Sequence, residues 1–144
     1  MKVKVITTMV LLLSLATNVM GQEGKYNLGR GYRAFVEIEE MGNFGIINLS
    51  TTHGYQFNPY LFLGVNLGFH ANSYNGVLPM LLGLDFRVYM SKNSQFTPYV
   101  GIRGGYLYTD IMAGLRFSLN KSLGLNISVS AGMVGLLFNV GFEF

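Results

Sequence analysis

Hydrophobic and polar residues alternate along most of the chain after about residue 30, and the alternation is clearest at its end. Between Leu136 and Phe144, every second residue is apolar, whereas the residues between them are small or polar except for Leu137. Because successive side chains of a β-strand point to opposite faces, this pattern predicts a strand with one wholly apolar face. That face holds Leu136, Phe138, Val140, Phe142 and Phe144.

Seven further segments alternate in the same way, so the pattern predicts eight strands separated by turns. Turn residues mark several boundaries, among them Gly42-Asn43, Asn58-Pro59 and the hairpin pair Asn75-Gly76. No segment after residue 21 has a helical period, which indicates an all-β fold. The expected strands cover approximately residues 31–40, 45–57, 61–71, 78–90, 100–108, 111–119, 125–131 and 136–144.

The polar faces of these segments separate a membrane barrel from a soluble β-sandwich. A sandwich turns its polar face to water, whereas here that face carries many glycines and charges of both signs, which suit the crowded interior of a narrow barrel. Strands of about 9 to 11 residues also match a tilted membrane crossing. The sequence therefore predicts a single eight-stranded antiparallel up-and-down barrel that spans a membrane. A soluble lipocalin-like binder, also eight-stranded, stays open as an alternative, although the chain lacks the Trp usual near the first strand of lipocalins.

Aromatic residues concentrate near the strand ends, as expected of two girdles at the level of the lipid headgroups. We expect one rim to carry Tyr32, Tyr55, Phe57, Tyr60, Phe96, Tyr99, Phe117 and Phe144. We expect the other rim to carry Phe69, Tyr74, Tyr106 and Tyr108.

The first 21 residues predict a cleaved signal peptide. Lys2 and Lys4 form a basic start, an apolar stretch follows, and Val19 and Gly21 are compact residues at the −3 and −1 positions of a cleavage site. A retained N-terminal anchor is the alternative. Without the signal, 8 basic residues (10 minus Lys2 and Lys4) face 7 acidic ones, so the net charge is near +1 and no basic patch points to nucleic acid. We expect residues 22–144 to form one barrel domain.

Charged residues on the predicted inner face are the main candidates for a functional site. Four basic and four acidic side chains in a narrow lumen should pair, because an unpaired charge there is unfavourable. Such a network would fill the interior as a structural plug, and the alternative is a gated ion path through it. The predicted lumen network consists of Arg33, Glu37, Glu39, Asp85, Arg87, Arg103, Arg116 and Glu143.

The two histidines are candidate catalytic bases of a lipid-modifying barrel enzyme. His53 lies near Ser50 and Thr51 in the sequence, but Ser50 takes the opposite face. His70 takes the lumen face, whereas Ser73 takes the other. Neither histidine therefore predicts a nucleophile–base pair. Two histidines without cysteines also give no recognisable metal-ligand spacing, and we expect no cofactor.

The order of several short segments resembles small eight-stranded outer-membrane barrels of the OmpA-like, OmpX-like and porin-associated type common in Bacteroidetes. The matching residues are Gln22 after the predicted cleavage site, residues 57–64, 78–80 and 97–101, and the C-terminal Phe142-Glu143-Phe144. The resemblance implies a bacterial outer-membrane location among lipid and a terminal strand read by the β-barrel assembly machinery. Its implied signal residues are Phe138, Val140, Phe142 and Phe144.

The resemblance favours a non-enzymatic role in envelope integrity or surface interaction. A narrow channel or a hydrophobic-ligand conduit is the main alternative. The sequence does not identify a surface or periplasmic partner.

Overall fold

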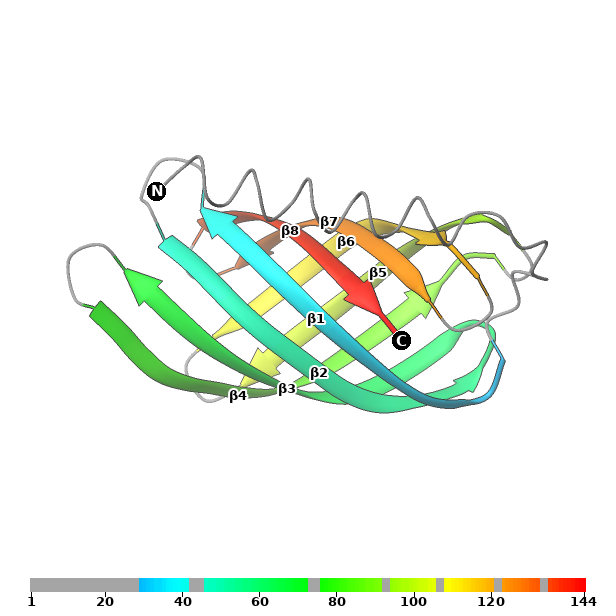
Figure 1. Ribbon diagram of the computed structural model, residues 1–144, viewed down its shortest axis with the longest axis horizontal. Helices are drawn as coiled ribbons and strands as arrows, with labels where there is room; N and C mark the ends of the chain where they lie inside the picture. The colour runs from blue at the N-terminus through cyan, green and yellow to red at the C-terminus, as the bar shows by residue number, and fades with distance from the viewer. Residues whose placement is uncertain are drawn as a thin grey trace.

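The chain forms a closed barrel of eight antiparallel strands joined in sequence order, which confirms the predicted fold class (Figure 1). The computed structural model describes residues 29–41, 46–72, 76–91, 94–105, 108–120, 123–132 and 135–144. None of these residues belongs to a helix long and apolar enough to cross a membrane. The strands are β1 (Gly31–Met41), β2 (Ile46–Asn58), β3 (Leu61–Asn72), β4 (Gly76–Tyr89), β5 (Phe96–Gly105), β6 (Thr109–Ser118), β7 (Gly124–Gly132) and β8 (Gly135–Glu143).

Pairing between the first and last strands closes the barrel. Six residue pairs join β1 to β8, from Phe35 opposite Glu143 to Glu40 opposite Phe138. The C-terminal residue extends this seam, because the backbone N–H groups of Ala34 and Phe144 each donate to the other residue's carbonyl. Closure leaves no strand edge along this seam, as a sheet in hydrocarbon requires. We call the end of the barrel where β1 begins and β8 ends the terminal rim, and the opposite end the far rim.

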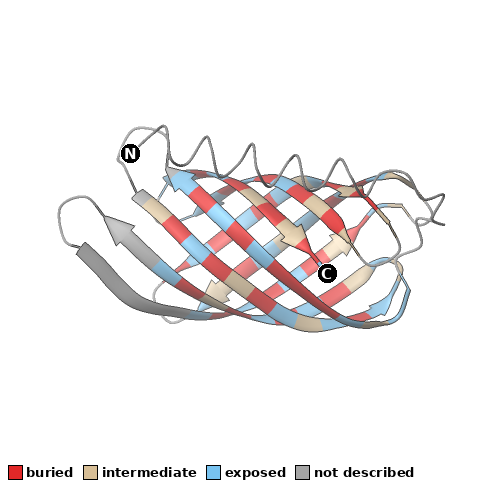
Figure 2. Ribbon diagram, viewed as in Figure 1, coloured by how far each residue is buried: buried red, intermediate tan, exposed pale blue. Residues whose placement is uncertain are grey.

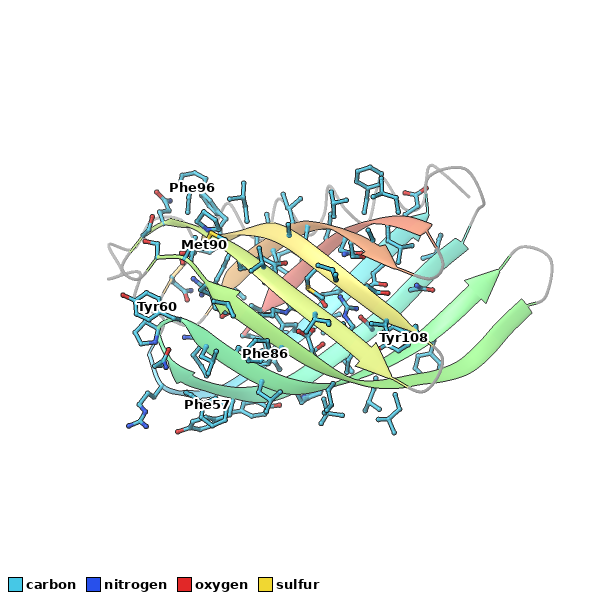
Figure 3. The ribbon with its side chains drawn as sticks, turned by 180° about the vertical axis from the view of Figure 1, so that it is seen from behind. Phe57, Tyr60, Phe86, Met90, Phe96 and Tyr108 are labelled. Atoms are coloured by element: carbon cyan, nitrogen blue, oxygen red, sulfur yellow. The ribbon has the colours of Figure 1, made fainter. Side chains whose placement is uncertain are left out.

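Buried and exposed residues alternate along the strands, so the inward and outward faces follow the predicted parity (Figure 2). On β8, the side chains of Leu137, Asn139 and Glu143 are buried, whereas Leu136 and Phe138 are exposed. The outward face is largely apolar, as expected for contact with lipid. Phe57, Tyr60, Met90 and Phe96 gather at the terminal rim, as Figure 3 shows.

Three predicted outward or rim side chains instead lie inside the barrel. Tyr108 is buried, because β5 ends at Gly105 and a turn closed by the Gly105 N–H and the Tyr108 carbonyl interrupts the alternation. Leu119 ends the predicted strand 111–119 with outward parity, but it is buried, because β6 ends at Ser118 and a turn closed by the Leu119 N–H and the Leu123 carbonyl follows. Tyr99 lies near the terminal rim but has inward parity and is 1% exposed. Tyr74 and Tyr106 lie outside the described residues.

Inward glycines make room for large side chains that would not otherwise fit in the lumen. A Cβ atom on Gly114 would lie 2.8 Å from the ring of Tyr99, and one on Gly141 would lie 2.5 Å from the Glu37 side chain. These distances are far below normal contact distances, so the glycines are required by close packing. The glycine-rich inner face noted in the sequence is therefore the counterpart of the buried aromatic and charged residues.

Candidate functional site: the charged lumen

The eight charged residues proposed for the lumen are all buried and all take part in ion pairs. They form two groups that share no ion pair with each other. The central charge cluster contains Glu37, Glu39, Asp85, Arg87 and Arg103. The rim charge cluster contains Arg33, Arg116 and Glu143 and lies toward the terminal rim.

Arg87 is the best-connected member of the central charge cluster. Its Nε and Nη2 atoms donate to the two carboxylate oxygens of Asp85 at 2.9 and 2.7 Å. Nη2 also lies 2.9 Å from both carboxylate oxygens of Glu37. A planar guanidinium group suits such two-pronged pairing, which fixes geometry as well as charge.

Arg103 joins the same carboxylates from another strand. It pairs with Glu39, and its Nη2 and Nε atoms lie 3.5 Å from Glu37 and 3.7 Å from Asp85. The cluster therefore places three carboxylates around two guanidinium groups. Each charge has an opposite charge beside it, as burial in a region of low dielectric demands.

The ion pairs of Arg87 and Arg103 with Glu37 and Glu39 cross the lumen, whereas those with Asp85 stay within β4 or join the paired strands β4 and β5. Glu37 and Glu39 belong to β1, Arg87 belongs to β4 and Arg103 belongs to β5. In a ring of eight strands, β1 and β5 are diametrically opposed. The Glu39–Arg103 pair therefore spans the barrel from one wall to the other, and the cluster occupies the cross-section.

An aromatic layer lies between the two charge clusters. We use this name for one buried group of four aromatic residues and a methionine, namely Phe35, Phe62, Tyr89, Tyr99 and Met112. The rings of Phe35 and Phe62 meet edge-to-face with centroids 5.0 Å apart, a favourable geometry for aromatic pairs. The Arg87 guanidinium carbon lies 4.2 Å from the centroid of the Phe35 ring, so a cation–π contact joins the layer to the central charge cluster.

The rim charge cluster is simpler and is centred on one carboxylate. Glu143 Oε1 lies 2.7 Å from Arg33 Nη1, and Oε2 lies 2.6 Å from Arg116 Nε. Asn126 donates a hydrogen bond to Glu143, and the Ser118 hydroxyl oxygen accepts one from Arg116. Because β8 carries Glu143 beside the β1 seam, this cluster links neighbouring parts of the wall.

Several uncharged lumen residues were missed by the sequence analysis. Thr52 donates to Asp85 at 3.4 Å, Asn66 donates to Thr52 at 2.8 Å, and the Tyr108 hydroxyl donates to Asn66 at 2.8 Å. This chain of hydrogen bonds continues the central cluster toward the far rim. The inward parity of Thr52 on β2 and Asn66 on β3 could have identified these two residues. Parity could not have identified Tyr108, because it follows the turn after β5.

Asp110 is a further buried lumen residue that the sequence analysis placed in a turn. It is 3% exposed and lies opposite Arg103 in the β5–β6 pairing. The structure begins β6 two residues earlier than predicted, at Thr109, and this start gives Asp110 inward parity. Among the described residues, no three His, Asp or Glu side chains are arranged to hold a metal ion.

The proposed assembly residues and the histidines lie elsewhere. Phe138 and Phe144 are exposed on the outer surface, and Val140 and Phe142 share their parity with intermediate exposure. His53 is exposed on the outside of β2, whereas Ser50 is buried in the lumen. The side chain of His70 lies outside the described residues.

Comparisons with known proteins support the fold. No protein-family model and no curated protein matches the chain. A solved structure from the de novo design of transmembrane β-barrels matches with a TM-score of 0.64 and 17% identity. The match covers 85% of this chain and 97% of the designed one. At this level of identity the similarity establishes a shared barrel fold.

Proposed function

We propose that the protein is a non-enzymatic outer-membrane barrel whose role is structural or lies in surface interaction. The observation that carries this proposal is the filled lumen: ion pairs cross the barrel in the central charge cluster, and the aromatic layer lies directly beside them. An interior of this kind stiffens the wall and leaves little room for solute. The function then resides in the wall and its rims.

An electrical measurement tests the closed lumen. The refolded barrel in a planar bilayer should give no stable conductance steps at moderate voltage. Stable and reproducible conductance that changes on Arg87→Gln or Arg103→Gln would contradict the proposal and support a channel.

A specific observation favours the channel as the second candidate. Arg87 Nη1, Arg103 Nε and Nη2 and the Tyr89 hydroxyl are buried without a hydrogen-bond partner in the described part of the chain. Buried donors of this kind commonly bind water. A continuous file of water past them would provide a narrow path, and the conductance measurement distinguishes the two functions.

The location and the processing of the chain are part of the same proposal. Residues 1–21 would act as a cleaved signal, and the outward residues of β8 would be read during assembly, as in the outer-membrane barrels that the sequence resembles. The apolar outer face supports a membrane location. The mature protein should fractionate with outer membranes and migrate differently in detergent gels before and after heating. Native protein in the soluble periplasmic fraction would contradict the proposal.

A further inference from the structure

A hydrogen-bonded polar group on the outer wall extends from the terminal rim toward the middle of the barrel. The Tyr32 hydroxyl is hydrogen-bonded to Nδ1 of His53, and Nε2 of His53 lies 3.0 Å from Oγ1 of Thr51. All three side chains have outward parity, Tyr32 on β1 and the other two on β2. These two strands lie side by side in the barrel (Figure 1). His53 pairs with two apolar residues on the neighbouring strands, Ala34, which is buried, and Val65, which is exposed on the outer wall. A hydrogen-bonded group in this setting calls for an explanation, because polar side chains rarely face lipid.

The three side chains carry more polar hydrogens than the hydrogen bonds among them can use. Two hydroxyls and a neutral imidazole carry three polar hydrogens in total, but only two hydrogen bonds join the three side chains. If Nδ1 carries the ring hydrogen, the Tyr32 hydroxyl hydrogen is left over, and if Nε2 carries it, the Thr51 hydrogen is left over. A protonated ring would leave both. Within the described part of the chain, no other side chain bonds to these three residues, so at least one donor faces the surroundings.

The depth of the group indicates which acceptor is available. Tyr32 lies opposite Tyr55 in the aromatic girdle of the terminal rim, and His53 and Thr51 lie further toward the middle of the barrel. Aromatic girdles lie at the headgroup level. The left-over donor therefore lies just beneath the headgroups, where the ester carbonyl oxygens of glycerolipids are found.

We infer that Tyr32, His53 and Thr51 form a binding site for the ester carbonyl of a membrane glycerolipid. The inference rests on the proposed membrane location. The site donates one hydrogen bond to the carbonyl oxygen, and the neighbouring apolar wall contacts the acyl chain. It is a binding site and not a hydrolase, because the backbone N–H groups of β1 and β2 are engaged in strand pairing and supply no oxyanion donors.

Ester and ether lipids test the inference, because only the ester lipid carries the carbonyl. The barrel is refolded into vesicles with equal amounts of diester and diether phosphatidylcholine of matched chain length. It is then extracted into mild detergent, and the retained lipid is measured by native mass spectrometry. The wild-type barrel should retain the diester lipid about fivefold over the diether lipid, the ratio expected from one neutral hydrogen bond.

A variant with Tyr32→Phe, Thr51→Val and His53→Phe removes every donor and should bring the ratio close to one. The outer wall becomes more apolar in this variant, so insertion should be preserved, and heat-modifiable migration checks it. The matched control is Tyr55→Phe with Thr109→Val, which removes two exposed outward hydroxyls outside the site and should keep the preference. An inserted wild-type barrel without diester preference, or a triple variant that keeps it, would overturn the inference. Failure of the wild-type barrel to insert would instead count against the membrane location.

Discussion

The two charge clusters of the lumen use the same residue types but connect the wall differently. In the central charge cluster, Arg87 and Arg103 reach carboxylates on the opposite side of the barrel. In the rim charge cluster, Arg33 and Arg116 share the single carboxylate of Glu143 close to the seam between β1 and β8. The first arrangement occupies the cross-section, and the second fastens a local part of the wall. The comparison shows that position in the barrel, rather than charge alone, determines what an ion pair does.

The largest effect should follow from removing the centre of the central charge cluster. Arg87→Met leaves Glu37 and Asp85 without their principal partner and should lower the free energy of unfolding by about 3–5 kcal/mol, as expected when one member of a buried pair is lost. Urea unfolding of the refolded barrel in lipid vesicles measures this change. Arg30→Met is the control, because Arg30 is exposed at the rim and should change stability by less than about 1 kcal/mol. Similar losses of stability for both variants would show that the buried Arg87 contributes no more than the exposed Arg30.

An intermediate effect is expected for the shared carboxylate of the rim charge cluster. Glu143→Gln keeps the shape of the side chain but removes the charge that Arg33 and Arg116 share. Hydrogen bonds to charged groups contribute about 1.5–3 kcal/mol, so unfolding should become easier by roughly that amount. The same unfolding experiment applies, and a loss equal to that of Arg87→Met would show that the two clusters contribute alike.

Phe144 should behave differently from its neighbour Glu143. Phe144 is exposed on the outer surface, so Phe144→Ser should destabilise the refolded barrel by only about 1–2 kcal/mol through lost apolar contact with lipid. In cells, however, the amount of inserted protein should fall further for Phe144→Ser than for Glu143→Gln, because the terminal aromatic residue would be read during assembly. Membrane levels are measured by fractionation, and equal levels for Phe144→Ser and wild type would refute the assembly role.

The smallest effect should come from Arg33. Arg33→Met leaves Glu143 paired with Arg116, so the carboxylate keeps one cationic partner. We expect a loss of about 1 kcal/mol or less in the unfolding experiment. A loss larger than that of Glu143→Gln would mean that Arg33 has a role beyond this ion pair.

Strand parity made most of the fold and the charged lumen predictable from the sequence. A period of two assigns each residue of a regular strand to one face, which places Arg87 and Glu143 inside and Phe138 outside. Parity fails where the strand ends, as the turn between Gly105 and Tyr108 illustrates. Parity also does not identify the strand on which an inward side chain finds its partner. The partition into two clusters and the aromatic layer between them therefore required the three-dimensional register of the strands.

The hydrogen-bonded group of Tyr32, His53 and Thr51 could not be predicted from the sequence for a related reason. Thr51 and His53 share a face of one strand, but their link to Tyr32 depends on the pairing of β1 with β2. Register between strands is set by the whole barrel and not by a local motif.

A double-mutant cycle between Glu37 and Arg87 tests the central claim, namely that ion pairs across the lumen hold opposite walls together. Unfolding free energies are measured for wild type, Glu37→Gln, Arg87→Met and the double variant in the same vesicles. We expect a coupling energy of at least about 1.5 kcal/mol, as found for close charge pairs that are excluded from water. Losses that simply add, within about 0.5 kcal/mol, would show that the two walls are not coupled through this pair.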